Sequence, residues 1–294
     1  MREKFYCVSP YYCDDARILR RNVVSPAKTA SSTCPFSGNV RQFDHNQVTM
    51  EMPMTTAFFV AADWLAEHID DPEIQILDAR MAPPGQEHRD MAGEYRAGHI
   101  PGALFFDDEG NLFSAPRAWW MLRTFGAEKV SILAGGLAGW QRDEWLLREG
   151  EEAHEEGEFE AKCVPQAVVR LTDVLLASHE KTAQIVDARP AARFNAQADE
   201  PRPGLRRGHI PGALNVPWTE LVYEGELKTT DELNEVFFSH GVSFDRPIIA
   251  SCGSGVTAAV VVLALATLDV PDVTLYDGAW SEWGARTDLP VEPA

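Results

Sequence analysis

The chain has 294 residues, enough for two ordinary domains, and its 45% hydrophobic content can fill a core in each. A formal net charge of −19 argues against nucleic acid or an anionic membrane surface as the main partner. The five cysteines show no CxxC or zinc-like spacing, which predicts no disulfide framework, no metal site and a reducing, cytoplasmic location. Residues 1–25 contain no apolar core of a signal peptide, and no apolar run is long enough to span a membrane.

Residues 1–53 match no other part of the chain. They mix Tyr, Cys, Ser and Arg without any periodicity. This pattern predicts an unstructured extension with no fold of its own. A targeting role is the alternative, supported by the arginines at positions 17, 20 and 21.

Three sequence blocks then occur twice, in the same order. The pairs are Ile76–Arg80 with Ile185–Arg189, Gly98–Leu104 with Gly208–Leu214, and the looser Val130–Trp140 with Val273–Trp283. Each block has the pattern of a short strand ending in a polar or glycine turn, and helical stretches lie between the blocks. This alternation predicts two α/β domains, each a parallel sheet flanked by helices. We expect the N-terminal domain at 54–148, an acidic, solvated linker at 149–165 and the C-terminal domain at 166–294.

The first copy is shorter than the second. Gly102 and Trp140 are 38 residues apart, whereas their equivalents Gly212 and Trp283 are 71 apart. The shortfall begins just after Phe106 and corresponds to a helix plus a strand. A parallel sheet without an interior strand leaves backbone groups unpaired. We therefore expect the first domain to be truncated.

The second copy contains the strongest chemical signal. Pro247–Ala250 predicts a buried parallel strand, and the apolar run Val256–Leu268 predicts a helix. Cys252 lies between them, with Gly253 and Gly255 allowing the backbone to curl around its sulfur. A strand–loop–helix turn directs backbone N–H groups and the positive end of the helix dipole to one place, which favours a thiolate nucleophile. A buried structural cysteine is the alternative.

Loop length separates two chemistries for such a cysteine. Tyrosine-phosphatase-like enzymes need Cys-x5-Arg, because the arginine closes bidentately on phosphate. Here the sixth residue after Cys252 is Ala258. The phosphatase hypothesis is therefore excluded.

The loop Cys252–Ala258 (CGSGVTA), with the tandem repeat, resembles the rhodanese superfamily and, within it, the mercaptopyruvate sulfurtransferases. The resemblance runs from about Met54 to Ala294. It implies two tandem rhodanese-like domains, an inactive first one and a catalytic second one, with a deletion of roughly 35–40 residues in the first. The implied reaction moves sulfur from 3-mercaptopyruvate, and less well from thiosulfate, through a Cys252 persulfide to cyanide, a thiol or a thioredoxin-like protein. Pyruvate is released, and no metal or organic cofactor is needed.

The resemblance also implies the other site residues. Arg193 and Arg202, nine residues apart, correspond to the arginines that hold the substrate's carboxylate and keto group, whereas Arg206 and Arg207 fit surface salt bridges better. The amides of the loop would stabilise the anionic sulfur. That loop comprises Gly253, Ser254, Gly255, Val256 and Thr257.

A proton relay of serine, histidine and an acid is proposed in the family. It corresponds here to Ser254 and His99, with Asp90 and Glu94 as candidates for the acid. Because His209 stands in the same motif in the second copy, His99 is equally well explained as a residue that fixes the Pro-Gly turn. A second function also stays open: a crippled, non-catalytic sulfur carrier or binding protein that lost part of its first domain.

Overall fold

The computed structural model describes residues 58–82, 86, 88–106, 114–153 and 161–293. The second repeat forms one five-stranded parallel sheet in the order β5-β11-β10-β6-β7. Its strands are β5 (Val168–Val169), β6 (Gln184–Asp187), β7 (Leu214–Asn215), β10 (Ile248–Ser251) and β11 (Val273–Tyr276). Every residue of β6 and β10 is buried, as the apolar runs of central parallel strands predict.

Helices flank this sheet and begin where the sequence signals them. They are α5 (Leu171–Glu180), α6 (Ala191–Phe194), α7 (Thr230–Ser239), α8 (Ala258–Thr267) and α9 (Ala279–Trp283). A capping box of Thr229 and Glu232 fixes the start of α7. A short antiparallel hairpin of β8 (Val222–Tyr223) and β9 (Glu226–Leu227) precedes that helix.

In the described residues the first repeat follows the order of the second without counterparts of β8, β9, α7 and β10, and its strands form two separate parallel sheets. Its elements are β1 (Phe59–Val60), α1 (Ala62–Glu67), β2 (Ile76–Asp78), α2 (Met91–Ala97), β3 (Ala103–Phe105), α3 (Ala115–Thr124), β4 (Ile132–Leu133) and α4 (Gly136–Arg142). Strand β1 pairs with β4, and β2 pairs with β3. By position along the repeat these strands correspond to β5, β11, β6 and β7. In the described part of the chain the place of β10, between β4 and β2, has no strand.

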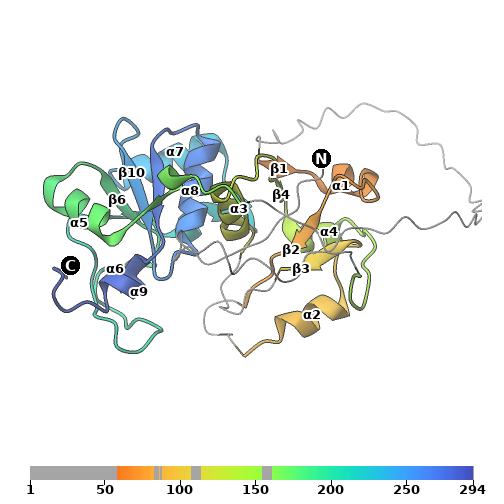
Figure 1. Ribbon diagram of the computed structural model, residues 1–294, viewed down its shortest axis with the longest axis horizontal. Coiled ribbons are helices and arrows are strands. Elements are labelled where there is room, and N and C mark those ends of the chain that lie inside the picture. Colours follow the sequence, from red (N-terminus) through yellow and green to blue (C-terminus); the bar gives the residue numbers. More distant parts are fainter. Residues whose placement is uncertain (1–57, 83–85, 87, 107–113, 154–160, 294) are drawn as a thin grey trace, which may run out of the picture.

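Helix α3 packs against α8 of the second repeat (Figure 1). Trp119, Trp120 and Met121 of α3 belong to the same buried cluster as the α8 side chains. Residues 258–265 of α8 are all buried, because the sheet covers one face of the helix and α3 contributes to the cover of another. This arrangement explains an apolar helix with no polar face.

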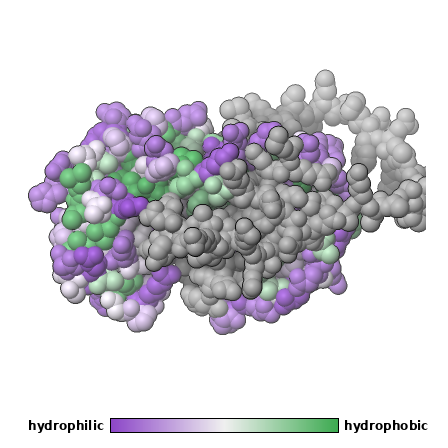
Figure 2. Space-filling view, viewed as in Figure 1, coloured by the Kyte–Doolittle hydropathy of each residue, from purple (hydrophilic) through white to green (hydrophobic). Residues whose placement is uncertain are grey.

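The expected α/β class is confirmed. Figure 2 shows hydrophilic residues along the outer edge of the second repeat, with hydrophobic residues between them. None of the helices in the described ranges has the length and apolar character needed to cross a bilayer.

Candidate active site

Cys252 lies directly after β10, at the carboxyl end of the sheet's central strand. It is buried, with 1% of the residue exposed. The beginning of α9 holds the loop through its carbonyl groups: the Trp280 amide donates to the Cys252 oxygen, and the Ser281 amide donates to the Gly253 oxygen, both at 2.9 Å. The backbone therefore fixes the position of the sulfur at the sheet edge where parallel α/β folds place ligands.

The amides of the loop have no partners among the residues that the structure describes. Within the described residues, no hydrogen bond is donated by the backbone N–H groups of residues 253–257. Buried amides in folded proteins are nearly always paired, so a run of unpaired ones beside a buried sulfur needs a partner. Successive N–H groups of this kind form an anion-binding concavity. The loop is built to receive negative charge at Cys252.

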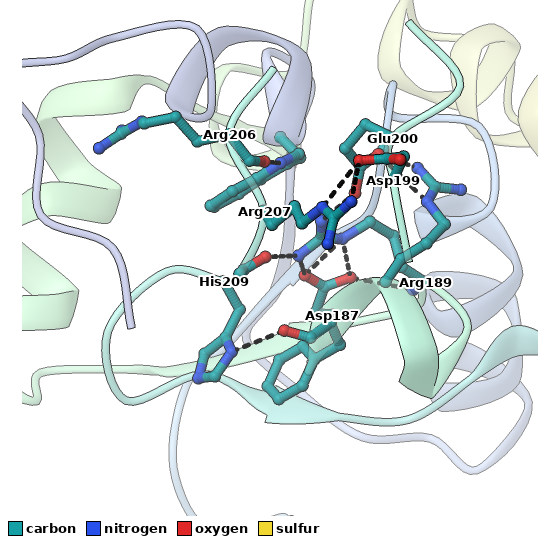
Figure 3. A network of polar contacts seen from close by, with 12 residues as sticks. Asp187, Arg189, Asp199, Glu200, Arg206, Arg207 and His209 are labelled. Carbon is teal, nitrogen blue, oxygen red and sulfur yellow. Dashed lines mark hydrogen bonds and ion pairs between the residues drawn. The ribbon is translucent and has the colours of Figure 1, made fainter. Parts of the chain in front are cut away.

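Arg193, on α6, approaches the loop at Gly253. A Cβ added to Gly253 would lie 2.8 Å from Nη2 of Arg193, so a side chain at this position would require the guanidinium to shift. Arg193 is ion-paired with Glu200, whose side chain is 1% exposed. The other oxygen of Glu200 lies 2.7 Å from Arg189, which in turn pairs with Asp187 at 2.7 Å. Figure 3 shows the Arg189 side chain between these two carboxylates.

This network is charge-balanced. Burial alone would lower the pKa of Arg189, but Asp187 and Glu200 outweigh it and raise that pKa above its ordinary value. Arg189 and Arg193 face two carboxylates, which leaves no buried charge uncompensated. The network orients Arg193 toward the loop.

Arg202 is linked to the same glycine, Gly253, through the side chain of Ser281. Its Nη1 donates to Oγ of Ser281 at 2.7 Å, and that hydroxyl donates to the Gly253 oxygen at 2.6 Å. The structure thus brings both sequence-predicted arginines to Gly253.

The other two arginines differ from each other. Arg207 pairs with Asp199 on the surface, as expected. Arg206 was expected to do the same, and this was wrong. It donates instead to three backbone oxygens near the carboxyl terminus, those of Trp283, Gly284 and Leu289, at 2.8–3.2 Å. These hydrogen bonds connect residues 283–289 to the rest of the second repeat.

His99 is completely buried in the first repeat. Its Nδ1 lies 3.0 Å from the backbone oxygen of Tyr95, and its ring stacks on the Tyr95 ring. Its Nε2 lies 3.4 Å from the Glu152 carboxylate. No contact between His99 and Ser254 is among the interactions of the described residues. The relay between these two therefore stays a prediction.

The second-repeat twin of His99 has the same surroundings. His209 contacts the Phe194 oxygen at 2.9 Å, stacks on the Phe194 ring and lies 3.6 Å from Glu292. The carboxylates also match, since Glu152 accepts from the Gly102 amide and Glu292 accepts from the equivalent Gly212 amide. The matching contacts favour a role in fixing the turn in both repeats.

The acid beside His99 is one that sequence reasoning missed. Asp90 caps α2, and Glu94 pairs with Arg89, so neither expected candidate is the neighbour of His99. Glu152 lies instead in the range expected to be a solvated linker. Burial would raise its pKa, but the Gly102 amide and Arg148 outweigh this and lower it.

Two further residues at the loop were not among the expected site residues. Arg117, on α3, and Asp277, just after β11, form a buried ion pair with 2.6 Å between Nη1 and Oδ1. Burial raises the pKa of Asp277, and Arg117 offsets only part of this effect. The repeat contained a signal for Asp277, because the first copy has an uncharged residue, Ala134, at the equivalent position.

The comparisons with known proteins agree with this geometry. A family model of the rhodanese-like domain matches residues 61–117 and 171–286. The chain belongs to the rhodanese-like domain family. The 3-mercaptopyruvate sulfurtransferase of Escherichia coli strain K12 is 69% identical, with 82% of this chain and 99% of that enzyme covered. The human 3-mercaptopyruvate sulfurtransferase is 34% identical, with coverages of 81% and 95%.

A solved structure supports the same assignment to the rhodanese fold. The crystal structure of SseA from Escherichia coli has a TM-score of 0.70 and 67% identity, and the match covers 76% of this chain and 99% of that one. The truncation is visible in the sequence comparison as well. The alignment with the Escherichia coli enzyme is 279 residues long, but 82% of this 294-residue chain is only about 241 residues. About 38 positions of that rhodanese relative therefore have no counterpart here.

Proposed function

We propose that this chain is a 3-mercaptopyruvate sulfurtransferase that works through a persulfide on Cys252. The observation that carries the proposal is the buried Cys252 beside the amides of residues 253–257, which donate to none of the described residues. Such a loop stabilises both a thiolate and the anionic end of a persulfide. The relatives at 69% and 34% identity have this activity as their name.

In the first half-reaction the Cys252 thiolate attacks the sulfur of 3-mercaptopyruvate. The new S–S bond forms as the carbon–sulfur bond breaks, and the electron pair leaves on carbon as the enolate of pyruvate, which then takes up a proton. Ser254, half-buried in the loop, is the proposed proton donor. The relay proposed in the family would add His99 as its partner, and the comparison of His99 with His209 tests that addition. The enzyme is left as the Cys252 persulfide.

The two arginines bind the departing α-keto acid. Arg193, oriented by Glu200, and Arg202, oriented by Ser281, converge on Gly253 and offer guanidinium groups to the carboxylate and keto oxygen. The loop itself carries no positive side chain, since Gly253 and Ser254 are uncharged. This favours 3-mercaptopyruvate over the thiosulfate dianion as donor.

In the second half-reaction an acceptor attacks the outer sulfur and regenerates the thiolate. A thiol or a reduced thioredoxin-like protein becomes a persulfide, and cyanide becomes thiocyanate. Because this cycle needs a reduced cysteine, we place the protein in the cytoplasm.

One observation favours a second candidate function. The first repeat has two separate sheets where the second has one, so the wall opposite the loop is incomplete in the described residues. A sulfur carrier or binding protein that no longer turns over would keep the Cys252 loop and lose the coupled release of pyruvate.

The test is the intact mass of the full chain after incubation with 3-mercaptopyruvate, together with pyruvate assay. We expect one added sulfur, one pyruvate per sulfur, and loss of the added mass on treatment with a small thiol. The Cys252→Ser chain is the control. Sulfur uptake without repeated turnover in the presence of thiol supports the carrier, and no uptake at all rejects both functions.

A further inference from the structure

Arg117 extends from the first repeat into the sulfur-binding loop of the second. Its residue is 7% exposed, its Nη1 lies 2.6 Å from Oδ1 of Asp277, and the same nitrogen donates to the Gly255 oxygen at 3.4 Å. The guanidinium also lies over the Trp120 ring, 4.6 Å from its centroid, which fixes the side chain on α3. Arg117 therefore has three contacts, with Asp277, Trp120 and Gly255, and the last of these residues belongs to the loop.

The contact acts on one particular peptide group. Gly255 has φ +81°, a conformation that favours glycine, and an added Cβ would lie 2.8 Å from Oδ1 of Asp277 and 3.3 Å from Nη1 of Arg117. In a trans peptide the C=O and the following N–H point in opposite directions. An arginine that holds the Gly255 oxygen therefore directs the Val256 N–H to the other side, and that N–H donates to no described residue.

The ion pair also controls the charge around the loop. Among the described residues, charged groups near the loop include Arg193 from α6, Arg202 through Ser281, Arg117 from α3 and Asp277 after β11, with Glu282 acting on Asp277. The Asp277 side chain is only 11% exposed, and without Arg117 its carboxylate would be an uncompensated charge next to the loop. The pair as a whole is neutral, so it can support the loop without opposing a thiolate.

We propose that Arg117 is a positioning residue of the active loop: it holds the Gly255 peptide, with Asp277 as its anchor, so that the Val256 N–H faces the sulfur of Cys252. This inference rests on the proposed sulfurtransferase function. It also assigns a task to the truncated first domain, which supplies the loop's outer support through α3. The helix does this by packing on α8, and the packing does not need the missing strand.

The experiment compares variants of the full chain in which the other four cysteines, at 7, 13, 34 and 163, are serine. Arg117→Met removes the contacts with Gly255 and Asp277. Arg117→Lys keeps the positive charge but lacks the planar guanidinium group. Arg123→Met is the matched control, because Arg123 is an exposed arginine on the same helix that also lies over an aromatic ring but does not touch the loop. Each variant is assayed for persulfide formation in a single turnover and for alkylation of Cys252 by iodoacetamide.

We expect Arg117→Met to lower both the maximal rate of persulfide formation and the alkylation rate by roughly tenfold or more, with little change in the half-saturating donor concentration. Arg117→Lys should recover part of the rate, and Arg123→Met should match the parent. Equal rates in Arg117→Met and the parent would overturn the proposal.

A double variant separates positioning from charge balance and from misfolding. Arg117→Met with Asp277→Asn leaves no unpaired buried charge, so we expect the melting temperature to recover toward the parent's while both rates stay low. Recovery of the rates in the double variant would show that Arg117 only neutralises Asp277, and would overturn the proposal. Alkylation needs no sulfur donor, so a parent that takes up no sulfur rejects the proposed function while the alkylation series still tests Arg117.

Discussion

The first repeat pairs β1 with β4 and β2 with β3, whereas the second repeat places β10 between the corresponding strands and joins all five into one sheet. This difference shows that one central strand decides whether the two pairs of strands form a single sheet. In the second repeat β10 connects the two halves of the sheet through pairing with β11 on one side and β6 on the other. It also ends at Cys252, so the strand that unites the sheet is the strand that presents the nucleophile.

The same comparison separates structural from functional residues. Features found in both repeats favour a role in the fold. They are the contacts of His99 and His209 at the two turns, and the pairing of Arg80 with Asp78 and of Arg189 with Asp187. Both of these arginines also donate to the oxygen of the glycine that precedes the histidine. Features described only in the second repeat belong to the Cys252 loop or to the side chains linked to it. They are Cys252, Asp277, Arg193 and Glu200.

The largest expected effect is on the nucleophile. Cys252→Ser should abolish sulfur uptake from 3-mercaptopyruvate, because an alcohol is neither ionised nor able to form a persulfide under these conditions. Cys163 is exposed and is the matched control, so Cys163→Ser should take up one sulfur per chain. Intact mass measures both, and sulfur found on the Cys252→Ser protein would contradict the assignment.

The next effect concerns substrate binding. Arg193→Ala and Arg202→Ala should each raise KM for 3-mercaptopyruvate by roughly 10- to 150-fold, since a charge-assisted contact is worth about 1.5–3 kcal/mol. Arg207→Ala should change neither KM nor stability much, because its pair with Asp199 is exposed. Steady-state kinetics compare the three.

Arg206→Ala sharpens this comparison of arginines. Its bonds to the oxygens of residues 283, 284 and 289 predict a lower melting temperature with an unchanged KM. Equal KM values across all four variants would show that the substrate carboxylate is bound elsewhere.

The two sheets should differ in local stability. Isolated two-stranded sheets are marginal, so we expect the amides of β2 and β3 to open at a free energy at least about 2 kcal/mol below that of β6 and β10. Native-state hydrogen exchange measures this difference. Restoring the roughly 38 residues of the Escherichia coli relative after Phe106 should reduce it. Equal protection in both repeats of the unaltered chain would contradict the expectation.

Local patterns in the sequence were sufficient for much of this structure. The apolar runs around Cys252 predicted β10 and α8 to within about two residues, and the repeat predicted parallel pairing of strands in both copies. The shortfall after Phe106 likewise anticipated the break between β4 and β2. These features depend on neighbours in the chain or on comparing its two halves.

The contacts that were missed join segments far apart in the chain. Nothing in the periodicity of α3 shows that Arg117 meets Asp277, and nothing in an acidic stretch marks Glu152 as the one carboxylate that accepts from Gly102. Arg206 was misread for the same reason, because its partners are backbone oxygens that no residue pattern reveals. Such pairings follow from tertiary packing, which sequence patterns describe only through burial.

The smallest expected effect tests the two histidines against each other. His99→Asn and His209→Asn each remove a buried ring that stacks on an aromatic neighbour and contacts a backbone oxygen. Because the surroundings match, we expect similar losses of about 1–3 kcal/mol in stability and less than about a twofold change in the rate of persulfide formation for both. Chemical denaturation and single-turnover assays measure the two quantities on the same preparations. If His99 instead belongs to a relay with Ser254, only His99→Asn will slow persulfide formation, and the rate lost will exceed anything seen in the equally destabilised His209→Asn protein. The twin in the second repeat thus supplies the control for stability that a histidine substitution usually lacks.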